Sequence, residues 1–139
     1  MKNTHFNKMD LEDRLIDFAV RCIKIAEELP NTVAGKHLNG QLTRSGTAPA
    51  LNYAEAQAAE SRQDFVHKMK ICLKELRETM VCIKMIKKLE YFKSERLDPM
   101  LQENNELISI FVKSIETAKI NIENERRLKI TPVVNGKTS

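Results

Sequence analysis

Apolar residues recur at steps of three and four along three stretches of this chain, and no other feature constrains the fold as much. The first repeat runs unbroken from Leu11 to Leu29 and stops at Pro30. Steps of three or four keep side chains on one side of an α-helix, so each stretch predicts a helix with an apolar face. Because the residue before a proline is disfavoured in helical geometry, the first helix is expected to end there.

A second helix is expected to begin near Thr32 or Val33, with small residues that let a neighbouring helix approach closely. Pro49 lies inside this segment and lacks a backbone donor. It therefore predicts a kink in the second helix, or a split near Thr47. The small residues are Ser45, Gly46 and Ala48.

A third helix is expected over residues 61–92 and a fourth over residues 98–127. Ser61, three residues before an aspartate, has the pattern of a capping residue. Asp98 followed by Pro99 resembles a helix start, because aspartate caps and proline suits the first helical position.

These elements predict an all-α protein, an up-down antiparallel four-helix bundle with a kinked second helix. We expect one domain at residues 10–127, a flexible leader at 1–9 and a flexible tail at 128–139. The 139 residues suffice for one core, and 4 glycines and 4 prolines are too few for a many-turned β-sandwich.

Basic residues concentrate in the third helix. Residues 68–96 contain nine basic and four acidic side chains, a net charge of +5, whereas residues 10–28 carry −3. Five of the basic residues share one helix face at heptad spacing, interrupted only by Val81. Such a line suits a phosphate backbone, but it equally suits a solvated helix face. The five residues are Lys70, Lys74, Arg77, Lys84 and Lys88.

Charged and amide side chains also fall close to the apolar lines of the second and third helices. A buried charge needs a partner, so we expect a structural polar cluster that fixes helix register. Some of these residues could instead face a subunit interface. The cluster comprises Arg44, Asn52, Glu55, Glu75 and Glu78.

Signals of catalysis and metal binding are weak. Bundle metal centres need two Glu-x-x-His motifs, and the chain offers one loose variant, Asp64 to His67. Cys22, Cys72 and Cys82 form no close pair and fit apolar core positions. We therefore expect no enzyme activity, no metal and no cofactor. The absence of a long apolar run or a signal peptide predicts a cytoplasmic protein with no membrane partner.

Several short motifs resemble the four-helix-bundle proteins of ribosomal-RNA intervening sequences, which are related to the accessory variability protein of diversity-generating retroelements. The resemblance spans roughly residues 10–125, with Ala56 where glycine is frequent and Val81-Cys82 where an aromatic pair is frequent. The motifs are Gln41-Leu42-x-Arg44-Ser45, Asn52-x-x-Glu55, Asp64-Phe65 and Glu75-Leu76-Arg77-Glu78-Thr79.

The resemblance implies a homopentamer with no established enzymatic activity. Its retroelement branch implies binding to RNA or DNA and to a reverse transcriptase through basic surfaces, here the basic face of the third helix. The expected function is therefore non-catalytic binding of structured RNA or DNA. The alternative is a protein-interaction scaffold with no nucleic-acid role, and a bundle enzyme is the weakest hypothesis.

Overall fold

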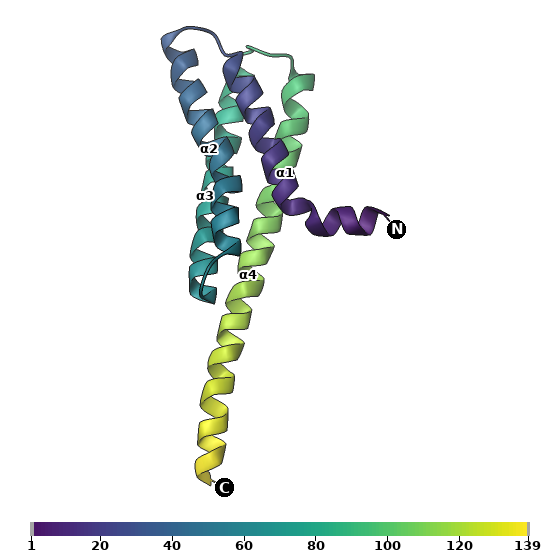
Figure 1. Ribbon diagram of the computed structural model, residues 1–139. Coiled ribbons are helices and arrows are strands. Elements are labelled where there is room, and N and C mark those ends of the chain that lie inside the picture. Colours follow the sequence, from purple (N-terminus) through teal and green to yellow (C-terminus); the bar gives the residue numbers. More distant parts are fainter. Residues whose placement is uncertain (1, 139) are drawn as a thin grey trace.

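Four α-helices form an antiparallel up-down bundle in the computed structural model (Figure 1). The structure describes the backbone of residues 2–138 and the side chains of residues 11–129. Close contacts join each helix to the next along the chain, and a smaller contact joins the first helix to the last. The predicted all-α bundle is confirmed. The helices are α1 (Lys2–Glu27), α2 (Val33–Gln57), α3 (Arg62–Lys88) and α4 (Ser94–Thr138).

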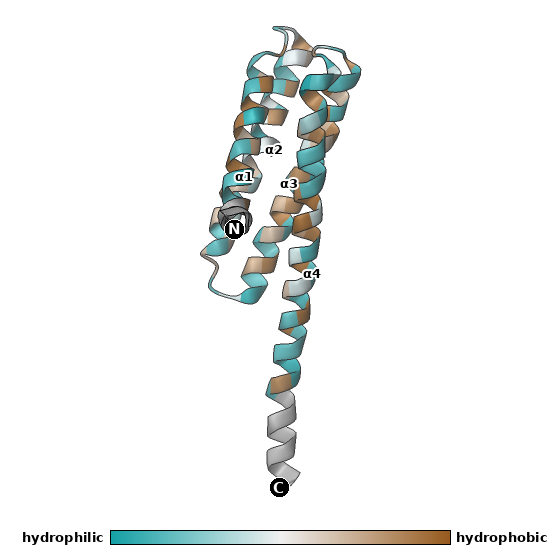
Figure 2. Ribbon diagram, turned by 90° about the vertical axis from the view of Figure 1, so that its right-hand side faces the viewer, coloured by the Kyte–Doolittle hydropathy of each residue, from teal (hydrophilic) through white to brown (hydrophobic). Residues whose placement is uncertain are grey.

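The arrangement places α1 and α3 across the diagonal of the bundle, because within the described residues no close backbone contact joins them. Hydrophobic and hydrophilic residues are interspersed along the coloured part of each helix (Figure 2), as expected of helices with one buried face. The leader expected at residues 1–9 and residues 130–139 of the expected tail lie outside the described side chains. Leu128 and Lys129 belong to α4.

The apolar repeat of α1 lies in the core, and the helix ends just before Pro30, as predicted. α2 is capped by Thr32, whose Oγ1 accepts a hydrogen bond from the Gly35 amide at 3.0 Å. A Cβ atom on Gly35 would lie 1.9 Å from the Pro30 carbonyl oxygen, so only glycine fits this turn. α2 continues through Pro49 as one helix rather than splitting near Thr47.

The cap of α3 is also as predicted: Ser61 Oγ accepts from the Asp64 amide at 3.0 Å. α3 ends at Lys88 rather than near Phe92. Glu90 follows with φ of 61°, a left-handed conformation that favours glycine.

The start predicted for α4 at Asp98 is wrong, because the helix begins at Ser94. Leu97 and Met100, three residues apart, are buried in the core, and only an earlier helix start places both there. Asp98 instead faces outward, where its Oδ1 lies 2.7 Å from Lys87 Nζ.

One core position of α4 is polar. Asn104 is fully buried on the same face as Leu97, Leu107 and Phe111. The amide orientation that satisfies both of its ends lets Asn104 donate to the Leu76 carbonyl at 3.0 Å and accept from the Met80 amide at 3.1 Å. This side chain therefore bonds directly to the backbone of α3.

Candidate nucleic-acid interface

The basic stripe of α3, defined as Lys70, Lys74, Arg77, Lys84 and Lys88, is exposed along its whole length. Leu76 and Ile83, which lie on the opposite side of the same turns, are fully buried. The apolar face of α3 therefore orients the stripe toward solvent, because burying that face leaves the opposite side outside.

Carboxylates neutralise little of the positive charge of the stripe. Lys74 Nζ lies 3.9 Å from Glu78 Oε2, and both side chains are partly exposed to water. Among the described side chains, the other four stripe residues form no ion pair. An exposed pair at this distance contributes little, so the stripe keeps most of its positive charge.

At the α3–α4 turn the stripe meets further lysines around a hollow of about 660 Å³. Lys84 and Lys88 come from the stripe, Lys87 from the last turn of α3, and Lys93 from the loop before α4. The heptad pattern missed Lys87 and Lys93. The +5 charge of residues 68–96 already counted them, but it could not place them together.

An apolar line starts within the stripe at Val81 and runs beside it to the end of α3. Val81, Met85 and Leu89, at steps of four, have 56%, 46% and 47% of their surfaces exposed. With His37 and Gln41 of α2, Val81 and Met85 border a groove of about 400 Å³. This line presents exposed apolar surface on the same helix as the stripe.

Part of the predicted polar cluster forms where α2 meets α3. The Arg44 guanidinium lies 3.2 Å from Glu75 Oε1 and 3.1 Å from Glu78 Oε1. Glu75 is 7% exposed, so Arg44 supplies the partner that a nearly buried carboxylate needs. The hydrogen bond to Glu78 and the negative charge of Glu75 raise the pKa of Arg44.

The other two predicted members lie elsewhere. Asn52 Nδ2 donates to the Ala48 carbonyl of its own helix at 2.9 Å. Glu55 Oε1 lies 2.6 Å from Lys68 Nζ, in an ion pair whose carboxylate is 58% exposed. Of the expected cluster of five, only Arg44, Glu75 and Glu78 come together. Asn52 and Glu55 make separate contacts, because they lie two or three turns further along α2 from Arg44.

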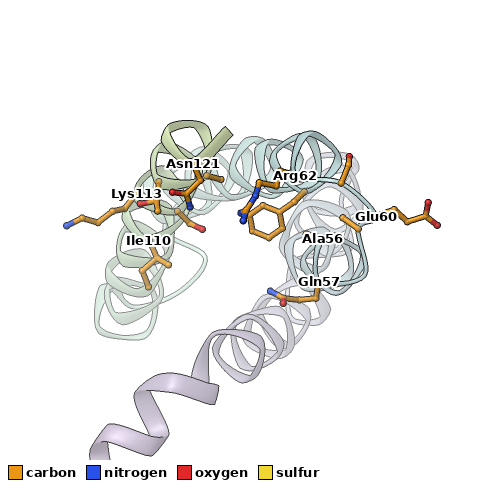
Figure 3. Close-up of a pocket in the computed structure, with 13 residues that line it drawn as sticks. Ala56, Gln57, Glu60, Arg62, Ile110, Lys113 and Asn121 are labelled. Atoms are coloured by element: carbon orange, nitrogen blue, oxygen red, sulfur yellow. The ribbon is translucent and has the colours of Figure 1, made fainter. Parts of the chain in front are cut away.

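A larger cavity of about 820 Å³ lies between the α2–α3 turn and α4. Its lining is mixed, and Glu60 and Lys113 point away from its centre (Figure 3). Arg62 Nε lies 2.9 Å from Glu125 Oε2, so its charge is balanced.

Besides Glu75, the core holds three thiols. Burial raises the pKa of Cys22 and of Cys72 to about 12, and that of Cys82 to about 11. The thiolate is the reactive form, so these residues are poor nucleophiles at neutral pH. Within residues 11–129, no three His, Cys, Asp or Glu side chains gather as a metal ion requires, and His67 is exposed.

No helix in the described part of the chain combines the length and the apolar character needed to cross a membrane. A search among curated proteins found no match. A solved structure is similar over most of the bundle: a protein of unknown function from the S23 ribosomal protein family of Bacteroides thetaiotaomicron. It shares 30% sequence identity at a TM-score of 0.71, over 76% of this chain and 97% of that one.

The sequence also matches a family model over residues 7–113, which covers most of α1, all of α2 and α3, and part of α4. The resemblance noted from the short motifs of α2 and α3 is thereby confirmed. The chain belongs to the family of 23S rRNA-intervening sequence proteins.

Proposed function

We propose that this protein is a non-catalytic, homo-oligomeric bundle that binds structured RNA or DNA through the basic stripe of α3. The observation that carries the proposal is the row of five exposed cations, of which one makes a weak ion pair. Lysine and arginine side chains gain affinity for phosphates by releasing condensed counterions. The stripe has the charge and the exposure for such contacts.

The length of the stripe also fits a nucleic-acid backbone. Lys70 and Lys88 are separated by 18 residues, which at 1.5 Å per residue spans about 27 Å. That length equals about eight base pairs of duplex. A rigid helix holds its cations on one line, so binding orders few backbone torsions.

Assembly would multiply this surface. We propose a homopentamer, as the resemblance implies, with the apolar line of Val81, Met85 and Leu89 contributing to contacts between copies. These three residues expose about half of their surfaces, and a contact would remove that surface from water. Several stripes acting together would raise avidity for a ligand long enough to reach more than one.

The second candidate function is a protein-interaction scaffold. The same apolar line and the groove beside it favour it, because an apolar surface recognises protein rather than phosphate. Salt separates the two functions, since phosphate contacts weaken steeply as salt rises and apolar contacts do not.

The test is fluorescence anisotropy with a labelled RNA hairpin and a labelled DNA duplex at several salt concentrations. Lys70→Glu combined with Lys84→Glu should weaken binding and reduce the salt slope by about 0.9 for each lost phosphate contact. Lys24→Glu combined with Lys36→Glu, on α1 and α2, changes net charge equally and should leave the slope unchanged. Absence of binding at low salt would overturn the nucleic-acid function.

A further inference from the structure

The hollow at the α3–α4 turn differs from the rest of the stripe in shape. Along the stripe, cations follow one another on a single helix. At the turn, the lysines come from two segments. Lys84, Lys87 and Lys88 of α3 line the same hollow as Lys93 of the following loop. Cations from separate segments can surround one anionic group, whereas a row on one helix contacts successive groups.

The hollow keeps a net positive charge. Four lysines line it against one carboxylate, Glu90. Lys87 is engaged by Asp98 at 2.7 Å, which leaves three lysines that form no ion pair among the described side chains. Ser94, the first residue of α4, also lines the hollow, so the partly positive N-terminus of that helix lies beside it.

The turn that carries Lys93 is held at both ends. The Arg96 guanidinium lies 5.2 Å from the ring centre of Phe92 and pairs with Glu28, the residue that follows α1. Asp98 links the start of α4 to Lys87 of α3. These contacts position the loop against the end of α3, so less side-chain and backbone freedom is lost when an anion enters.

We propose that this hollow binds the terminal phosphate of a nucleic-acid strand whose backbone follows the basic stripe; the inference rests on the proposed function. A phosphate within the chain is a diester with one negative charge. A terminal phosphate is a monoester, which carries a charge of about −1.5 to −2 at pH 7 and three acceptor oxygens. Converging lysines therefore favour a phosphorylated strand end over an internal phosphate or a hydroxyl end.

The experiment compares one RNA hairpin in three forms: 5′-phosphorylated, 3′-phosphorylated and with hydroxyl groups at both ends. We expect at least one phosphorylated form to bind about fivefold tighter than the hydroxyl form, as an added charge-assisted contact predicts. The preference should fade below about pH 6, where the monoester takes up a proton.

Substitutions test whether the lysines of the hollow cause the preference for a phosphorylated end. Lys88→Gln combined with Lys93→Gln should abolish it, and Glu90→Gln should increase it by removing the carboxylate of the hollow. The matched control, Lys70→Gln combined with Lys74→Gln, should weaken all three hairpins by the same factor. Circular dichroism verifies that each variant is folded.

The outcomes separate the two proposals. Equal, salt-sensitive binding of all three hairpins would overturn the terminal-phosphate site and leave the proposed function standing. A preference that survives in the Lys88→Gln, Lys93→Gln variant would also overturn the site. No binding of any hairpin at low salt would overturn both.

Discussion

At Gly46 the lack of a side chain lets α1 and α2 approach closely. A Cβ atom there would lie 2.6 Å from Cys22 Cβ and 2.8 Å from its sulfur. Gly46→Ala should therefore force the helices apart and lower the free energy of unfolding by about 1–3 kcal/mol, measured by urea denaturation. Gly40 is a matched control, because a Cβ there meets no atom within 4 Å.

Gly40→Ala lies in the same helix on an exposed position and should stabilise the protein by about 0.5–1 kcal/mol. Equal effects of the two substitutions would contradict the close contact between α1 and α2.

The three buried cysteines predict a response to pH. Their folded pKa values of about 11 to 12 lie above the ordinary value of 9.0. The unfolded chain therefore loses its thiol protons at lower pH than the folded chain, so stability should fall as pH rises from about 9 toward 12. Urea midpoints across this range measure the effect.

At neutral pH a thiol reagent should label the folded protein slowly and label all three cysteines after unfolding. Rapid labelling of the folded protein would contradict their burial.

At the scale of the elements, Asn104 ties α4 to α3. Its amide reaches the Leu76 carbonyl and the Met80 amide, so a shift of α4 along α3 would break both bonds. A single buried polar residue among apolar ones is a means of fixing helix register. Asn104→Ala should lower the free energy of unfolding by about 1–3 kcal/mol, through lost hydrogen bonds and an unfilled space.

Asn105 is the control for this prediction, because it is the neighbouring asparagine and is exposed. Asn105→Ala should change stability by less than about 0.5 kcal/mol. Similar losses in the two variants would show that Asn104 contributes nothing special to the packing of α4.

At the scale of the whole molecule, opposite helices carry different surfaces. α3 presents the basic stripe and the apolar line, whereas α1 lies across the diagonal, and residues 10–28, from α1 into the turn after it, sum to a net charge of −3. If α3 mediates assembly, Val81→Glu combined with Met85→Glu should lower the particle mass in multi-angle light scattering while circular dichroism stays helical.

Ile16→Glu combined with Val20→Glu is the matched control on α1, where the two side chains are 44% and 42% exposed. That variant should keep the mass of the parent protein. Loss of mass in the α1 variant alone would place the interface on α1 instead.

The elements were predictable where local chemistry decides them. Thr32 and Ser61 cap their helices through bonds to amides three residues ahead, and Pro30 ends α1 through its own ring. The start of α4 was not predictable this way, because the burial of Leu97 depends on a core built from the other helices. Asn104 was missed as well, since a polar residue looks like a gap in an apolar repeat.

The sequence by itself determined the helical class, three apolar faces, the Ser61 cap and the row of cations on α3, because each depends on residues within one or two turns of each other. Only the tertiary structure decided that Arg44 pairs with Glu75 and Glu78 while Glu55 pairs with Lys68. It alone gathered lysines of α3 and of the following loop around one hollow. Such pairings depend on which helix faces meet and on how the helices are aligned along the bundle axis. The spacing of residues along one helix does not determine either.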